Sequence, residues 1–175
     1  MQTAEHILQA IHKLGEKRKP LTRVYRSLFS EDLYLTAYDK IARNHGALTK
    51  GTESDTADGM SRTRIQRIIN ELREEKYRFK PARRIQIPKK SGGTRPLGIP
   101  NFTDKLVQEA LRMMLEAYYE PLFRDSSHGF RPGRGCHTAL GSLLYKFKGA
   151  AWFIEGDIRG CFDHTSGCLF KNASA

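Results

Sequence analysis

An aspartate at the end of a short apolar run is the residue of this sequence best suited to chemistry. Asp157 follows the apolar run 152–154 and precedes a segment that ends in Phe162 and Asp163. A carboxylate carried by a rigid strand is a hard oxygen ligand, which suits Mg²⁺ in two-metal phosphoryl transfer. The backbone carbonyl of Ile158 would add an oxygen, and the ring of Phe162 would wall a sugar pocket. Taken alone the signal is weak, because an aspartate at a strand end is more often a cap or turn residue.

Concentrated basic charge is the second feature. Residues 62–95 contain twelve Lys and Arg against three Glu, and Arg83, Arg84 and Lys90 are candidate contacts to nucleic acid among them. Such a stretch suits a phosphate backbone, because each neutralised phosphate releases counterions. Lys and Arg at a hairpin tip can also close over a triphosphate. The alternative is a solvated helix face followed by a basic turn.

A loop rich in glycine and arginine, residues 127–135, is the third feature. Its glycines let a backbone approach a ligand closely, and its arginines can fork onto phosphates. The alternative is an ordinary surface turn. The candidate nucleic-acid contacts in it are Gly129, Phe130, Arg131, Pro132, Gly133 and Arg134.

The whole composition agrees with an anionic partner. The formal net charge is +11 and the pI is near 9.8. Such an excess favours nucleic acid as the partner, although a soluble basic protein is the alternative. Three scattered cysteines without a Cys-x-x-Cys pair favour neither a disulfide framework nor a structural zinc site. No signal peptide or membrane-spanning run is visible, so we expect a cytoplasmic protein without a membrane partner.

Elements that would position these residues follow from the periodicity of apolar side chains. A loop is predicted over 44–60, and the next helix begins at Ser61 as its N-cap. A buried strand over 152–154 would deliver Asp157. The sequence further predicts helices over 3–14, 103–120 and 138–147, two helices within 21–43 with a cap between them at 30–32, and a hairpin over 83–100.

Together and in this order, the segments resemble the reverse transcriptases encoded by group II introns, from about residue 20 to residue 163. Each motif is modest, but the series at these spacings is highly specific. The matching motifs are Tyr34-Leu35, Asn44-x-Gly46-Ala47, Ile87-Pro88-Lys89-Lys90-x-Gly92, Arg95-Pro96-Leu97-Gly98-Ile99-Pro100, Asp104-Lys105-Leu106-x-Gln108-Glu109, Glu116-Ala117-Tyr118-Tyr119-Glu120-Pro121, the segment from Ser127 to Arg134, and the segment from Phe153 to Asp163.

The resemblance implies an α+β fold: the fingers of a right-hand polymerase, a helical N-terminal extension and the beginning of the palm. The implied domains are an extension over 1–82, fingers over 83–150, the first palm strand over 151–163 and a divergent tail over 164–175. The implied function is RNA-directed DNA synthesis together with a maturase role in splicing. The partners would be group II intron RNA, a template–primer duplex and dNTP, with Mg²⁺ as cofactor.

Position by position, the resemblance makes Asp157 the first metal-binding carboxylate, with the Ile158 carbonyl beside the metal and nucleotide. Phe162 would be the ring that excludes a ribose 2′-OH. Lys89 and Arg95 would hold the phosphates of the incoming nucleotide. The 127–135 loop would lie near template and primer.

Two departures from the family pattern modify this expectation. Residues 49–54 lack the proline and the last glycine of Thr-Pro-Gly-x-Asp-Gly, which predicts a looser loop. After Asp163 the pattern is abandoned, and the Tyr-Ala-Asp-Asp motif with the remaining carboxylates is absent. We therefore expect a truncated chain that is inactive alone. A non-enzymatic basic RNA-binding module and a decayed remnant are the alternatives.

Overall fold

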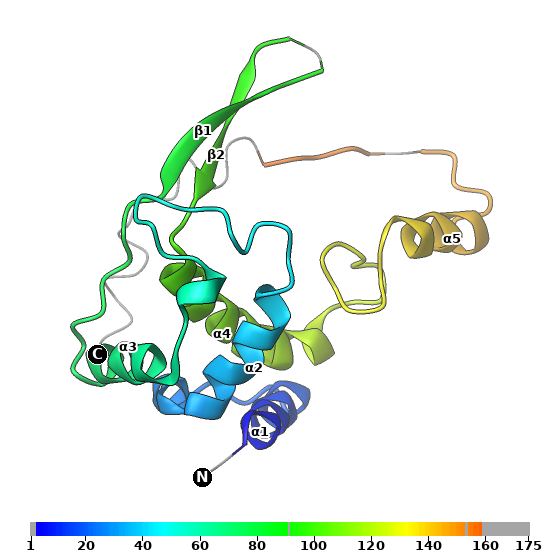
Figure 1. The fold of residues 1–175 in the computed structure, drawn as a ribbon. Coiled ribbons are helices and arrows are strands. Elements are labelled where there is room, and N and C mark those ends of the chain that lie inside the picture. The colour runs from blue at the N-terminus through cyan, green and yellow to red at the C-terminus, as the bar shows by residue number, and fades with distance from the viewer. Residues whose placement is uncertain (1–2, 91, 153, 159–175) are drawn as a thin grey trace. The chain divides into compact units, whose positions relative to one another are not determined.

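The computed structural model describes residues 3–90, 92–152 and 154–158, and it divides into two compact units, Met1–Asp125 and Ser126–Ala175. The first unit contains helices and one hairpin (Figure 1). Its helices are α1 (Ala4–Glu16), α2 (Glu31–Ile41), α3 (Arg62–Arg73) and α4 (Phe102–Tyr119), with short 3-10 turns at Val24–Phe29, Ala57–Gly59 and Glu120–Leu122. Helices with a small two-stranded sheet agree with the expected α+β class.

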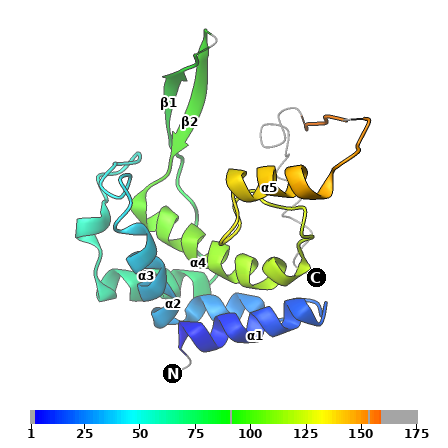
Figure 2. The same ribbon diagram turned by 90° about the vertical axis from the view of Figure 1, so that its right-hand side faces the viewer.

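The core lies between the four helices (Figure 2). Leu33, Tyr34 and Ala37 of α2 are fully buried, and so are Leu106 and Ala110 of α4. These spacings of three and four residues place each set on one helix face, which the amphipathic pattern of the sequence predicts. The apolar stripe of α3 packs into the same cluster.

Local signals explain where two of the helices begin. The Thr3 hydroxyl accepts a hydrogen bond from the His6 N–H at the start of α1, and the Ser61 hydroxyl accepts one from the Arg64 N–H at the start of α3. Each satisfies a backbone donor that has no partner within its helix. The predicted N-cap at Ser61 is confirmed.

The predicted hairpin is confirmed as β1 (Arg83–Pro88) paired antiparallel with β2 (Thr94–Ile99). Its strands extend away from the helices (Figure 1). The turn depends on Gly92 and Gly93, whose φ angles of 86° and 77° lie in the region that favours glycine.

The predicted break between two helices within 21–43 is confirmed, because Ser30 is the N-cap residue of α2. The first of the two is a 3-10 helix, Val24–Phe29, and not the predicted α-helix. The Tyr25 hydroxyl donates to the Leu72 carbonyl of α3 at 2.7 Å, a tertiary contact that helical periodicity does not report. The prediction of a buried strand over 152–154 is wrong, because Trp152 and Ile154 are more than 90% exposed and lie outside any strand. A strand needs a paired neighbour, which a sequence pattern cannot supply.

The second unit contains α5 (Cys136–Lys146), preceded by the glycine- and arginine-rich loop. Within the described part of the chain, no helix has the length and apolar character needed to cross a membrane.

Candidate nucleic-acid interface

The hairpin carries five of the predicted contact residues, all of them exposed. Its register pairs Arg95 with Ile87 and Arg83 with Ile99. Because side chains alternate along a strand, Arg83 and Arg95 lie on one face of the hairpin and Arg84 lies on the other. Lys89 is adjacent to the turn, where its N–H donates to the Gly93 carbonyl at 3.0 Å. The structure therefore places Lys89 and Arg95 near the tip, and Arg83 and Arg84 at the base.

The 44–60 loop is hydrogen-bonded to the first strand's base. Arg83 Nε donates to the Lys50 carbonyl at 3.1 Å, and the Thr52 hydroxyl lies 3.1 Å from the Pro81 carbonyl. Lys80 forms an ion pair with Glu53. These contacts involve residues 50–53, within the segment that departs from the family pattern, and they attach that segment to the base of the hairpin.

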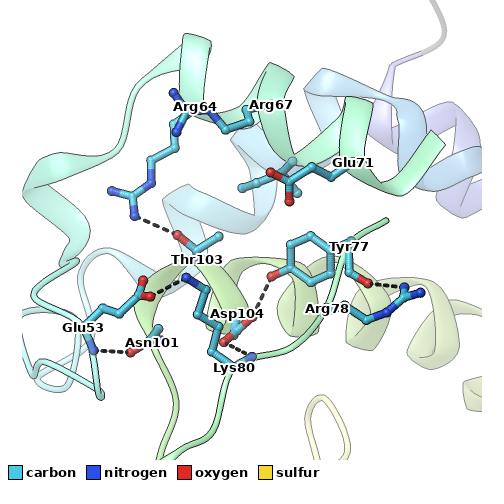
Figure 3. A pocket seen from close by; sticks show the side chains of 11 residues that line it. Glu53, Arg64, Arg67, Glu71, Tyr77, Arg78, Lys80, Asn101, Thr103 and Asp104 are labelled. Atoms are coloured by element: carbon cyan, nitrogen blue, oxygen red, sulfur yellow. Dashed lines mark hydrogen bonds and ion pairs between the residues drawn. The ribbon is translucent and has the colours of Figure 1, made fainter. Parts of the chain in front are cut away.

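A cavity of about 190 Å³ lies between α3, the segment 77–80 and the beginning of α4 (Figure 3). Most of its lining residues are charged, and both signs are present. The basic lining residues are Arg64, Arg67, Arg78 and Lys80, and the acidic ones are Glu53, Glu71 and Asp104.

Tyr77 and Asp104, two of the residues that line this cavity, are joined by a hydrogen bond. The Tyr77 hydroxyl donates to Asp104 Oδ1 at 2.6 Å, and the Lys80 N–H donates to Asp104 Oδ2 at 3.2 Å. Asp104 is only 2% exposed, so these donors replace the water that its carboxylate lost. Burial and the hydrogen bond to Asp104 raise the pKa of the Tyr77 hydroxyl well above its ordinary value, which keeps it a donor.

Asp55 joins the loop to the first turn of α4. Its carboxylate accepts hydrogen bonds from the Phe102 N–H at 3.2 Å, the Thr103 N–H at 2.9 Å and the Thr103 hydroxyl at 2.8 Å. Arg64 of α3 donates to it at 3.1 Å. Burial would raise the pKa of this carboxyl, but the hydrogen bonds from Thr103 and Phe102 and the charge of Arg64 outweigh burial and lower the pKa.

Sequence reasoning assigned no role to Asp55, Tyr77 or Asp104, although Asp104 belongs to one of the family motifs. Aspartate is one of the residue types that often cap helices, so its presence in a polar loop was the one available signal for Asp55. The helix that Asp55 caps begins 47 residues later, however, and a pattern of neighbouring residues cannot identify a partner at that distance.

The glycine- and arginine-rich loop belongs to the second unit and is described by itself. Arg131 Nη1 donates to the Ser127 carbonyl at 2.8 Å, and His128 Nδ1 lies 2.9 Å from the Thr138 hydroxyl. Phe130 is fully exposed and has a φ of 56°, an uncommon conformation for a bulky residue. Gly129, Pro132 and Gly133 are exposed, whereas Arg131 and Arg134 are half-buried. The Arg131 side chain is therefore bonded within the loop, and the Phe130 ring is presented to solvent.

Asp157 and Ile158 are exposed and lie outside any helix or strand, and Phe162 lies outside the described residues. Among the residues that the structure describes, no three metal-ligating side chains converge. Asp157 and the Ile158 carbonyl would supply only part of the oxygen ligands that a two-metal centre needs.

Comparisons with protein families and with individual proteins agree with the resemblance seen in the sequence. The family model "Reverse transcriptase (RNA-dependent DNA polymerase)" matches residues 87–166. The group II intron-encoded protein LtrA of Lactococcus lactis is 51% identical over 167 residues, covering 94% of this chain and 28% of LtrA. An uncharacterised 91 kDa protein in the cob intron of Schizosaccharomyces pombe is 48% identical, covering 91% of this chain and 21% of that protein. The chain thus spans less than a third of the length of these relatives.

Proposed function

We propose a function from the premise that this chain belongs to the reverse transcriptases and maturases encoded by group II introns. The activity proposed for the whole protein is RNA-directed DNA synthesis with a maturase role in splicing. The part proposed for the described residues is to grip RNA. Group II intron RNA, a template–primer duplex and dNTP are the proposed partners.

The observation that carries the proposal is the exposed basic hairpin. Within the described residues, Arg84, Lys89, Lys90 and Arg95 form no ion pair with a carboxylate of the chain. Their charge is therefore available to phosphates, whose binding releases counterions. Lys89 and Arg95 are assigned to the phosphates of the incoming nucleotide, and Arg83, Arg84 and Lys90 to the nucleic-acid backbone.

The second unit supplies the remaining proposed contacts. Residues 129–134 are assigned to template and primer, and the exposed Phe130 ring suits stacking on a base. Asp157 and the Ile158 carbonyl are assigned to Mg²⁺ in the whole protein, with Phe162 beside the sugar. Mg²⁺ would stabilise the charge that develops on the transferred phosphoryl group.

The domain boundaries belong to the same proposal. Residues 1–82 form the extension, 83–150 the fingers, 151–163 the first palm segment and 164–175 a divergent tail. An RNA-binding module without catalysis is the second candidate. It is favoured by the first unit, which has its own core and carries the hairpin without contribution from Asp157.

A salt series tests the RNA grip. Binding of a fluorescent single-stranded RNA would be measured by anisotropy for the native chain and for a triple variant, Lys89→Ala, Lys90→Ala and Arg95→Ala. Each lost phosphate contact should lower the slope of log affinity against log salt by about 0.7. Lys40→Ala, an exposed lysine of α2, is the matched control and should keep the native slope.

A native affinity that does not change with salt would contradict the proposal, and so would a triple variant with the native slope. Primer extension by the complete protein, compared with its Asp157→Ala variant, addresses the catalytic half separately.

A further inference from the structure

We propose that Asp55 is a positioning residue, which holds the 44–60 loop on the base of the hairpin. It thereby orients the hairpin for binding nucleic acid, although Asp55 itself does not contact the nucleic acid. The inference rests on the proposed RNA grip. It concerns a residue that is not part of the hairpin.

The first step is that Asp55 acts as the N-terminal cap of a helix distant from it in sequence. Asn101 occupies the N-cap position of α4, yet its side chain makes no capping hydrogen bond. The Phe102 and Thr103 N–H groups at this end have no partner within the helix, as at any helix start. The Asp55 carboxylate accepts from both of them, and it is only 5% exposed.

The second step is that Asn101 makes the reciprocal contact. Its Oδ1 accepts from the Glu53 N–H at 3.0 Å and lies 3.2 Å from the Thr52 hydroxyl (Figure 3 shows the Glu53 contact). The helix end thus holds the loop through Asn101, while the loop holds the helix end through Asp55. We call this arrangement of Thr52, Glu53, Asp55, Asn101 and Thr103 the clasp.

The third step is the clasp's location. Asn101 comes two residues after Ile99, the last residue of β2, so the clasp lies at the base of the second strand. The same loop reaches the base of the first strand through the Thr52–Pro81 and Lys50–Arg83 hydrogen bonds. The bases of both strands are therefore bonded to the same loop, and the direction in which the hairpin points depends on that loop.

The consequence is energetic rather than chemical. A hairpin released from the loop would sample more directions, and binding RNA would then include the cost of ordering it. Affinity should therefore fall by about threefold to tenfold, which corresponds to roughly 1 kcal/mol. Charge predicts the opposite sign, because removing an acidic residue should strengthen binding to a polyanion.

These opposite signs make a sharp experiment. RNA affinity and its salt slope would be measured for Asp55→Ala, Asp55→Asn and the control Asp58→Ala, which removes the same charge from an exposed position three residues away. Asp55→Ala should weaken binding while keeping the native salt slope, because no phosphate contact is lost. Asp55→Asn keeps an acceptor and should recover most of the affinity. Asp58→Ala should bind as tightly as the native chain or more tightly.

Amide hydrogen exchange gives a second readout that does not need RNA. The Phe102 and Thr103 amides should exchange faster in Asp55→Ala than in the native chain, since both lose their acceptor. If Asp55→Ala does not fold, Thr52→Val removes only the loop hydroxyl of the clasp and should also weaken RNA binding with an unchanged salt slope.

Native affinity in Asp55→Ala, or in Thr52→Val where Asp55→Ala does not fold, would overturn the inference and leave the proposed RNA binding standing. Unchanged exchange at Phe102 and Thr103 would do the same. Absence of RNA binding by the native chain would overturn both proposals.

Discussion

At the residue scale, the protonation state of Asp55 connects local chemistry to stability. Its carboxylate receives three hydrogen bonds from the start of α4 and one from Arg64. All four donors favour the charged form over the protonated form, so the lowered pKa of this carboxyl has an identifiable cause. A group whose pKa is lower in the folded state than in the unfolded state stabilises the fold when it is charged.

Folding stability should therefore depend on pH through Asp55. The contribution is present above the unfolded pKa of about 4 and is lost as the pH falls through the lower folded pKa. Urea unfolding of the native chain and of Asp55→Asn at pH 7, 5, 4 and 3 measures it, because asparagine does not titrate. The stability advantage of the native chain should shrink below pH 4. An advantage that stays constant from pH 7 to pH 3 would contradict this assignment.

At the element scale, close packing between the loop and α4 depends on one glycine. Gly51 is buried, and a Cβ atom added to it would lie 2.7 Å from the Asn101 backbone nitrogen and 2.9 Å from its Cα. Backbone atoms at these distances cannot move aside without moving the helix end. The glycine that the loop retains is therefore required sterically.

Gly51→Ala should consequently destabilise the first unit by about 1–3 kcal/mol, the usual cost of overpacking. Thermal unfolding followed by circular dichroism measures the change. Gly46→Ala in the same loop is the matched control, because its added Cβ would meet no atom within 4 Å. Equal melting temperatures for the two variants would show that the loop does not pack against α4 in this way.

At the scale of the whole molecule, the two units contribute different things. The first unit joins the helical core, the clasp and the basic hairpin. The second unit carries the 127–135 loop, α5 and Asp157. Nucleic-acid binding can therefore be tested in this chain separately from catalysis, which needs several carboxylates around two metal ions.

Primer extension on an RNA template with Mg²⁺ and dNTP should show no synthesis by this 175-residue chain above that of Asp157→Ala. The reason is that Asp157 lies exposed and outside any helix or strand, and within the described ranges no cluster of metal-ligating side chains includes it. Synthesis that depends on Asp157 would refute this expectation.

Periodicity and composition determined much of this protein without a structure. The amphipathic stripes of α1, α3 and α4 and the strand–turn–strand pattern of 83–100 are local, because side chains a few residues apart share one face. Net charge is likewise a sum over residues, so the basic character of the hairpin was evident. The order and spacing of the motifs were enough to identify the family.

Tertiary structure alone decided which distant groups meet. The cap of α4 comes from Asp55, and the 24–29 turn is held by a hydrogen bond from Tyr25 to α3, so neither could be inferred from neighbouring residues. The predicted strand over 152–154 failed for the same reason. A strand is completed by backbone hydrogen bonds to a partner, and the identity of that partner is a property of the fold and not of the segment.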